Sequence, residues 1–388
     1  MSAIGGMVNW ETKNIDSRPL FEMSRAMLLR GGARRRAYIH GSVALVQNDE
    51  SSALPQLPRL FAEDQRRLAA IIDGTPRLSS SGEELGDALY DPTETETLLR
   101  AYHQLGTSLA DALNGNFALA ITDEERAELY LARDRDGTRP LFYCENEQTF
   151  FFASEIRALL RIQNPLFRVD TERVRSHLCS PCGASFAEDL YCGVSSLPTG
   201  HSAVFSRLGL RIFPNQLPPQ PENTLATQPR LSLEFYLPDE EELARMLTEL
   251  LFAFEAPEFD HLMPSLLHHL SQKREQGCPP RLLLEDPMLH LSLRYANTRA
   301  DRIGAMKKIT LIPTAAERSF VREKDLKRLE KTLRALLGSI DTTPLRALLG
   351  EAWSEEITRE KNTARRIRME GMAYQTILWF EHFPLWLT

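Results

Sequence analysis

The stretch LNGNFALAITDEERAELYLARDRDGTRPLFY, residues 113–143, decides which fold we expect. Two apolar runs, FALAI at 117–121 and LYLA at 129–132, flank the polar residues TDEER. Each run has the length of a strand, and a short polar segment between two such runs is typical of a β-hairpin. We therefore predict an antiparallel hairpin with a slightly long turn.

Strand-like segments also precede and follow this hairpin. The runs AYIHGSVALVQND (37–49) and RRLAAIIDG (66–74) are apolar, have the length of strands and end at Asp or Gly. The segment GVSSLPTGHSAVFSRLGLRIF (193–213) predicts a second hairpin. We therefore expect the first half of the chain to consist mainly of short strands.

Two helices are expected among these strands. In ETETLLRAYHQLG (94–106) the apolar residues fall on one side of a helix, and Gly106 marks its end. The segment TFFFASEIRALLRI (149–162) begins as a strand and turns helical at Ser154, a residue type that commonly caps helix N-termini.

The pattern changes at PNQLPPQPENTLATQP (214–229), which is rich in Pro, Gln and Asn. We place a first domain at 2–215, a Pro-rich linker at 216–230 and a second domain at 231–388. Beyond the linker, helical spacing dominates, and two short runs look like buried strands. The predicted helices are 239–257, 261–277, 323–340 and 373–383, and the two strands are 231–238 and 281–286. The fold class expected is α+β.

The composition is that of a soluble globular protein, with 388 residues, 43% hydrophobic and 26% charged. The net charge of −7 gives no general case for nucleic-acid binding. The apolar runs are too short to span a bilayer, and no basic region followed by an apolar core begins the chain. We therefore expect a cytoplasmic protein whose five cysteines are mainly free thiols.

The motifs, taken in order, resemble a known family. They are MSAIGG at the start, the hairpin and Arg-Asp-x-x-Gly turn of 114–143, FFASEIRALL at 151–160 and LPTGHSAVF at 197–205. This order is similar to glutamine-dependent asparagine synthetases, whose architecture β-lactam synthetases and lasso-peptide cyclases share. The resemblance implies an N-terminal-nucleophile αββα sandwich, followed by a truncated, helix-rich α/β synthetase-like domain. It covers about the first 215 residues well and the rest more weakly.

The family's nucleophile is a Cys after the initiator Met, and this chain has Ser2 there. A hydroxyl needs stronger base assistance than a thiol. The small residues Ser2 and Ala3 would let Met1 be removed, and an N-terminal Ser can use its own α-amine as the base. Ser2 alone therefore leaves the activity open.

The substrate-binding positions implied by the family have also changed. An Arg that holds the glutamine carboxylate matches Ser42 in HGSVALV, and Ser lacks the guanidinium fork. The family's Asn-Gly-Glu, which binds substrate and the oxyanion, matches Asp73, Gly74 and Thr75. A carboxylate offers an acceptor where an oxyanion needs a donor. Glu94 stands for the Asp that binds the substrate amine. These changes favour an inactive glutaminase.

The synthetase half lacks the family's Ser-Gly-Gly-x-Asp-Ser loop, which would hold pyrophosphate. Its later acidic loop falls at LLLEDPMLHLSLRY, where Glu285 and Asp286 remain and the glycines are gone. Lys361 matches a catalytic Lys of β-lactam synthetases, but without a nucleotide loop we interpret it as a surface residue. No cofactor is expected.

Two further clusters were considered. Cys179, Cys182 and Cys192 form a weak zinc candidate, because the second pair of ligands that a tetrahedral site needs is missing. We interpret them as small buried thiols. The basic run RGGARRRAY (30–38) is interpreted as a solvated loop, since the family has an Arg-Gly turn there.

The sequence therefore predicts a catalytically degenerate asparagine synthetase homologue, a pseudoenzyme that acts as a binding or scaffold subunit. Its expected partner is a second copy or an active paralogue, in the formation of an amide, lactam or peptide macrocycle. Two enzymatic alternatives stay open. One is an ATP-independent amidohydrolase that uses Ser2, and the other is a residual asparagine synthase-type amide-forming enzyme.

Overall fold

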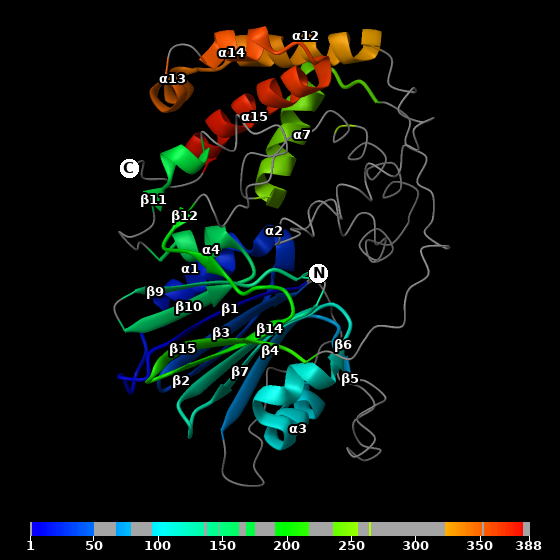
Figure 1. The fold of residues 1–388 in the computed structure, drawn as a ribbon. Helices are drawn as coiled ribbons and strands as arrows, with labels where there is room; N and C mark the ends of the chain where they lie inside the picture. Colours follow the sequence, from blue (N-terminus) through cyan, green and yellow to red (C-terminus); the bar gives the residue numbers. More distant parts are fainter. Residues whose placement is uncertain are drawn as a thin grey trace, which may run out of the picture. The chain divides into compact units, whose positions relative to one another are not determined.

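The computed structural model describes residues 2–49, 67–78, 95–135, 137, 139–146, 148–162, 168–174, 191–216, 236–254, 264, 323–350 and 353–382. The chain forms two compact units (Figure 1). Unit 1 comprises Met1–Phe167 and Gly193–Asn223, and unit 2 comprises Arg168–Cys192 and Thr224–Thr388. The segment Arg168–Cys192 thus groups with unit 2, whereas the expected boundaries placed it in the first domain.

Two antiparallel sheets make up most of unit 1. Within the described residues, the first sheet has six strands in the order β13 (Ser195–Ser196), β9 (Phe142–Asn146), β10 (Thr149–Ala153), β1 (Ser2–Val8), β3 (Val43–Asp49) and β2 (Arg34–His40). The second has five, in the order β15 (Gly209–Pro214), β14 (His201–Ser206), β8 (Glu128–Arg133), β7 (Phe117–Asp123) and β4 (Leu68–Gly74). Short strands β5 (Arg77–Leu78) and β6 (Leu113–Asn114) pair separately.

The two sheets stack face to face, and successive side chains of each strand point alternately to the core between the sheets and to the outer face. One core cluster joins side chains of β1, β3 and β10 to side chains of β4, β7, β8 and β14. The outer face of the second sheet packs on α3 (Thr95–Leu105) and the 3₁₀ helix η2 (Gly106–Ala112). The outer face of the first sheet carries α1 (Arg18–Ala26), α2 (Leu28–Gly31) and α4 (Ile156–Leu160). Unit 1 is therefore the αββα sandwich that the resemblance implied (Figure 1).

The glycine pair Gly5–Gly6 lets β1 lie at the centre of its sheet with close packing on both faces. A Cβ on Gly6 would come within 2.5 Å of the Phe152 ring, between the sheets. A Cβ on Gly5 would lie 3.0 Å from the Met27 methyl group on the helical face. Side chains at these two positions would push the layers apart.

Most predicted strands and helices of unit 1 are confirmed. The hairpin of 113–143 is β7–β8, and the second hairpin is β14–β15. Two details were wrong. The run 37–49 is not one strand, because it turns at Gly41, where φ is +53°, and forms the β2–β3 hairpin. Ser154 does not cap α4, because its hydroxyl accepts from the Ile4 N–H and donates to Asp73.

Unit 2 is built around one long helix, α15 (Thr363–His382), which packs against α7 (Glu240–Phe254), α12 (Glu323–Ser339), α13 (Thr343–Leu349) and α14 (Trp353–Arg359). The predicted helices at 239–257 and 323–340 are confirmed as α7 and α12. The helix predicted at 373–383 is confirmed, but it begins earlier, at Thr363. The helix predicted at 261–277, apart from Pro264, and the strand predicted at 281–286 lie outside the described residues. In 231–238, the described residues 236–238 are not a strand.

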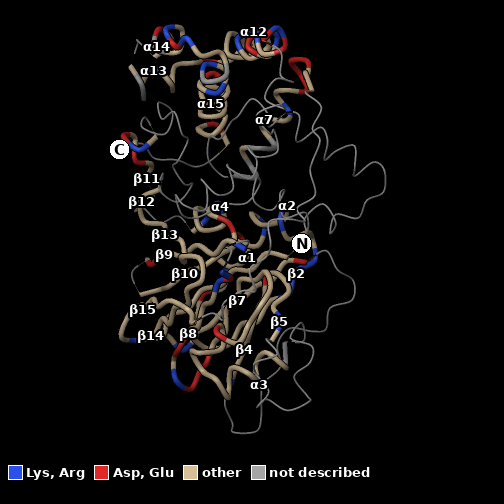
Figure 2. Tube along the Cα trace, turned by 45° about the vertical axis from the view of Figure 1, so that its right-hand side comes forward, with Lys and Arg blue, Asp and Glu red and all other residues tan. Residues whose placement is uncertain are grey.

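Ion pairs join α12 to α15. The carboxylate of Glu330 accepts from Arg366 at 2.6 Å, and that of Glu370 accepts from Arg334 at 2.7 Å. Both glutamates are buried. Figure 2 shows the remaining charge of unit 2, with Lys and Arg interspersed among Asp and Glu along α12 and α14. No helix in the described part of the chain is long and apolar enough to cross a membrane.

A two-stranded ladder ties the segment 168–192 into unit 2. Strand β11 (Arg168–Val169) pairs with β12 (Tyr191–Cys192). The Tyr191 ring meets Trp379 of α15 edge to face, with centroids 5.5 Å apart. The indole N–H of Trp379 donates to the Tyr191 hydroxyl at 2.7 Å, and both side chains are buried.

Candidate active site

The start of β1 and the end of β4 meet at one end of the sandwich. The hydroxyl of Ser2 donates a hydrogen bond to Oδ1 of Asp73 at 3.1 Å. The backbone N–H of Gly74 donates to the Ser2 Oγ at 3.3 Å. Ser2 is half-buried and Asp73 is fully buried. The fold thus brings together three residues that are 71 and 72 positions apart in the sequence.

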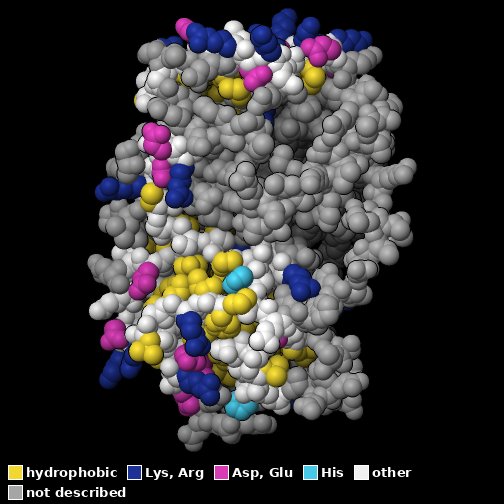
Figure 3. All heavy atoms as spheres, viewed as in Figure 1, with side chains coloured by type: hydrophobic (Ala, Val, Ile, Leu, Met, Phe, Trp, Pro, Cys, Tyr) yellow, Lys and Arg dark blue, Asp and Glu magenta, His cyan; other side chains and the backbone are white. Residues whose placement is uncertain are grey.

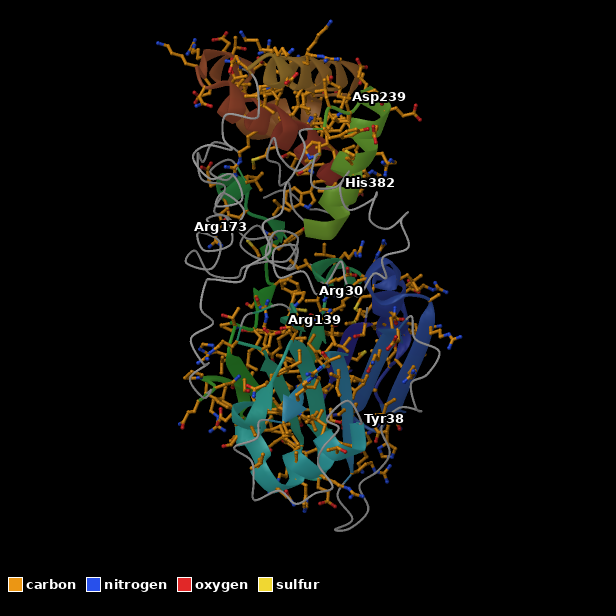
Figure 4. The ribbon with its side chains drawn as sticks, turned by 90° about the vertical axis from the view of Figure 1, so that its right-hand side faces the viewer. Arg30, Tyr38, Arg139, Arg173, Asp239 and His382 are labelled. Atoms are coloured by element: carbon orange, nitrogen blue, oxygen red, sulfur yellow. The ribbon has the colours of Figure 1, made fainter. Side chains whose placement is uncertain are left out.

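The Asp73 carboxylate has partners at both oxygens. Oδ2 accepts from Nη2 of Arg30 at 2.7 Å and from the hydroxyl of Ser154 at 3.3 Å. Oδ1 lies 3.4 Å from Nη1 of Arg139. The two arginine side chains are only 10% and 13% exposed, so these interactions are largely shielded from water. Figure 4 shows Arg30 and Arg139 close together at this end of unit 1.

The backbone around Asp73 requires glycine. Gly74 has φ +109°, and a Cβ there would lie 2.0 Å from the carbonyl oxygen of Asn116. The same carbonyl accepts from the Thr75 N–H at 2.9 Å, which holds β4 against the loop before β7. The Thr75 side chain itself is exposed. Gly74 therefore places its own N–H beside Ser2, and Thr75 holds this turn in position through its backbone N–H.

Ser42 lies at the opposite end of the first sheet from Ser2. In the β1–β3 ladder, Val8 pairs with Val43, whereas Ser2 pairs with Asp49. Six residue steps along β3 separate the two ends by about 20 Å. The structure therefore brings Asp49, which is 7% exposed, to the Ser2 end and keeps Ser42 away from it. Ser42 was placed at the site by its match to a family motif, and such a match does not show at which end of the sheet a residue lies.

The other sequence-based candidates either lie outside the described residues or are exposed elsewhere in the chain. Glu94, Glu285, Asp286, Cys179 and Cys182 lie outside the described residues. Lys361 is exposed between α14 and α15, and Cys192 is exposed in β12. In the described part of the chain, no group of His, Cys, Asp and Glu could hold a metal ion.

Sequence reasoning missed Arg30, Arg139 and Ser154 as members of this site. Arg30 was assigned to a solvated loop, yet it ends α2 with a largely buried side chain. Arg34–Arg36, from the same basic run, belong to strand β2 instead. The signals available were the Arg-Gly turn of the family pattern and a hydroxyl residue after the strand TFFFA. Neither signal says that both side chains meet at one carboxylate.

Chemically, the site is a hydroxyl held by a carboxylate. The Ser2 hydroxyl proton is directed at Asp73, and one backbone N–H is directed at the Ser2 oxygen. A carboxylate offers about four acceptor positions, and four donors surround this one. The arrangement contains a nucleophile type and a backbone donor, the parts from which acyl-transfer sites are built.

Part of the sequence matches known proteins. Residues 60–214 match the family model of the glutamine amidotransferase domain. The chain is 34% identical over 121 residues to asparagine synthetase [glutamine-hydrolyzing] 3 of Bacillus subtilis, covering 31% of this chain and 20% of that protein. It is 35% identical over 108 residues to a putative asparagine synthetase of Mycobacterium bovis, covering 27% and 16% of the two chains. The matches thus span a fifth or less of these relatives.

Solved structures show weaker likeness. Glutamine phosphoribosylpyrophosphate amidotransferase from Bacillus subtilis has a TM-score of 0.39 at 13% identity, covering 64% of this chain and 58% of that one. A glutamine aminotransferase class-II domain protein from Silicibacter pomeroyi has a TM-score of 0.29 at 13% identity, covering 55% and 98%.

Residues 60–214 thus carry a glutamine amidotransferase domain. This part of the chain is similar to glutamine-hydrolysing asparagine synthetases.

Proposed function

We propose that this chain is a degenerate member of its family that no longer hydrolyses glutamine and acts as a binding or scaffold subunit. The observation that carries the proposal is the Asp73 carboxylate, which accepts the Ser2 hydroxyl at 3.1 Å. In the family pattern an Asn occupies this position and helps to bind the oxyanion.

The charge of Asp73 opposes amide hydrolysis. Attack of the Ser2 oxygen on a carbonyl carbon would create an oxyanion beside the Gly74 N–H. The Asp73 carboxylate lies at the same end of β4, so it would face that oxyanion. Two isolated unit charges about 4 Å apart repel by ~4 kcal/mol at an effective dielectric constant of ~20, and the ion pairs of Asp73 with Arg30 and Arg139 reduce this repulsion. A side chain that should stabilise the transition state would instead raise its energy.

Proton transfer from Ser2 is also poorly supported. The Asp73 carboxylate already accepts from Arg30 and Ser154, in addition to Ser2. A base in this position would have to give up one of these interactions to take the Ser2 proton. The α-amine of Ser2 could serve only after Met1 is removed.

Substrate binding loses its expected cation as well. The residue opposite Ser2 in the β1–β3 ladder is Asp49, whereas Ser42, which the resemblance matches to the family's arginine, lies at the other end of the sheet. A glutamine carboxylate at this position would meet a buried carboxylate rather than a guanidinium fork.

The scaffold role rests on what the chain retains. Both units keep buried apolar cores, while the sequence lacks a pyrophosphate loop. Figure 3 shows apolar side chains gathered on the side of unit 1 that faces the viewer, and an exposed apolar patch is a feature of surfaces that bind protein partners. The proposed partner is a second copy or an active paralogue in amide, lactam or peptide-macrocycle formation. The proposed compartment is the cytoplasm, without nucleic acid or cofactor.

One observation favours the alternative of an N-terminal-Ser amidohydrolase. The Gly74 N–H donates to the Ser2 Oγ at 3.3 Å. It is therefore close enough to donate a hydrogen bond to an oxyanion formed by attack of Ser2. The two functions differ in what they require of Ser2, because only the hydrolase needs a free Ser2 α-amine.

The test compares four proteins for ammonia release from glutamine: wild type, Ser2→Ala, Ser2→Cys and Ser2→Cys/Asp73→Asn. The N-terminal residue of each is determined by mass spectrometry. We expect no turnover in the first three and a gain in the double variant once Met1 is removed. Wild-type turnover that is lost in Ser2→Ala would establish the hydrolase instead. Light scattering of the wild type tests self-association, and a strict monomer that captures no partner would remove the scaffold role.

A further inference from the structure

A concave site lies at the other end of unit 1 from Ser2. The pocket has a volume of about 370 Å³ and is formed by four loops: those after β1, between β2 and β3, between β7 and β8, and between β14 and β15. Its lining residues are Trp10, Glu11, Thr12, Lys13, Gly41, Ser42, Glu124, Ala127 and Arg207. We call it the distal pocket, because Ser2 begins β1 and the lining residues 10–13 follow the end of that strand.

Backbone hydrogen bonds hold two of these loops together. The Asn9 N–H donates to the Ser42 carbonyl at 3.0 Å, and the Ile15 N–H donates to the Gly41 carbonyl at 2.8 Å. Arg207 Nη2 donates to the Trp10 carbonyl at 3.3 Å, which ties the β14–β15 turn to the same wall. The pocket is therefore largely pre-formed, as small-molecule sites usually are.

Charges of both signs face the distal pocket. Lys13 and Arg207 supply two cations, and Arg207 has only a loose contact with Glu11, at 3.9 Å. Glu11 and Glu124 supply two carboxylates. The indole N–H of Trp10 is buried, and it has no acceptor among the described residues. An acceptor group on a ligand would find several donors on this wall.

Glu124 is held in one position by its neighbours. The Tyr38 hydroxyl donates to Oε1 at 2.5 Å, and His40 Nδ1 lies 2.6 Å from Oε2. Arg67 Nη1 lies 2.5 Å from His40 Nε2, so the ring proton belongs on Nδ1, facing Glu124. Burial raises the pKa of Tyr38, and its hydrogen bond with Glu124 raises it further. The hydroxyl of Tyr38 therefore stays protonated and remains a donor. The carboxylate is thus fixed at the pocket wall.

We propose that the distal pocket binds a small zwitterion, a molecule of about the size of one amino acid with a carboxylate and a primary amine. Its carboxylate pairs with Lys13 and Arg207, and its amine pairs with Glu124 and Glu11. A ligand with both charges pairs with the two cations and with the two carboxylates of the pocket. A simple anion would be repelled by the carboxylates, and a simple cation would be repelled by Lys13 and Arg207. The proposal does not depend on whether Ser2 is active.

The experiment is calorimetric titration of the full chain with L-alanine and L-glutamine. Propionate and propylamine serve as probes with a single charge. The variants Lys13→Met and Arg207→Gln each remove one proposed carboxylate contact. Arg211→Gln, an exposed arginine of β15 outside the pocket, is the matched control, and Ser2→Ala separates this pocket from the Ser2 end.

We expect saturable binding of at least one amino acid, weakened about tenfold or more by Lys13→Met and by Arg207→Gln. Arg211→Gln and Ser2→Ala should change the affinity less than about twofold. Circular dichroism of each variant checks that it is folded. Absence of saturable heat up to about 10 mM of either amino acid would overturn the proposal. Equal binding of propionate or propylamine, or loss of binding in Ser2→Ala alone, would also overturn it.

Discussion

Oδ2 of Asp73 lies 2.7 Å from Nη2 of Arg30, in an ion pair that joins the end of β4 to the end of α2. Asp73 is fully buried and the Arg30 side chain is 10% exposed. Buried ion pairs add little net stability when they form, but breaking one leaves an uncompensated charge. At the Ser2 end, the same carboxylate therefore serves both the packing and the chemistry of the site.

Replacing Asp73 should cost stability as well as change reactivity. Asp73→Asn keeps the shape of the side chain but leaves the Arg30 and Arg139 guanidinium groups without their carboxylate. We expect a loss of about 3 kcal/mol in the free energy of unfolding, measured by urea denaturation. Asp16→Asn is the control, because Asp16 and Arg18 form an ion pair with side chains 55% and 90% exposed. Equal urea midpoints for the two variants would contradict a structural role for Asp73.

Replacing Gly74 by alanine should destabilise the protein more than the same change at another glycine with positive φ. Gly74→Ala places a Cβ 2.0 Å from the Asn116 carbonyl oxygen, so we expect a loss of more than about 3 kcal/mol. Gly209→Ala is matched in backbone angle, with φ +96°, but its Cβ would meet nothing within 4 Å. It should cost only about 1 kcal/mol. Thermal unfolding of both variants gives the comparison, and a Gly209→Ala effect as large as that of Gly74→Ala would refute the steric explanation.

The contributions of two glutamates of unit 2 to the free energy of unfolding should change with pH in opposite directions. The hydrogen bond from Arg366 lowers the pKa of Glu330, so the folded state binds fewer protons there than the unfolded state. Its stabilising contribution is present above the unfolded value of 4.5 and is lost as the pH falls. Burial raises the pKa of Glu370, so its contribution instead decreases as the pH rises above 4.5.

The matched variants Glu330→Gln and Glu370→Gln separate these effects. Urea unfolding between about pH 4 and pH 7 should show Glu330→Gln less stable than wild type, with the difference greatest at pH 7. Glu370→Gln should gain relative to wild type as the pH rises. The assignment fails if both variants change in the same direction with pH.

The contact between Tyr191 and Trp379 should couple the segment 168–192 to α15. Tyr191→Phe leaves the buried indole N–H of Trp379 without its acceptor, so we expect a loss of about 1–2 kcal/mol. In a Trp379→Phe background the same change should cost clearly less, because the donor is already gone. A double-mutant cycle measured by chemical denaturation gives the coupling energy. Additive effects would show that the two side chains do not interact.

The sequence determined the strands and helices wherever apolar residues repeat with a clear period. The hairpin β7–β8 and the helix α3 were predictable because alternation or helical spacing continues over a whole element and a Gly or a polar turn ends it. The strand 37–49 was wrong because a glycine within an apolar run does not reveal whether the chain continues or turns. That choice depends on whether the two halves can pair, as β2 and β3 do.

For the site, the sequence pointed to Ser2 and to Asp73–Gly74, and the structure brings these residues together. It could not show that Arg30, Arg139 and Ser154 share the Asp73 carboxylate, because these contacts join residues 43 to 81 positions apart. The strand register decided that Asp49 lies opposite Ser2 and that Ser42 lies at the other end. Local patterns report what a segment prefers by itself. Which charges meet in a buried site depends on the packing of two sheets and their helices, and only the tertiary structure decides it.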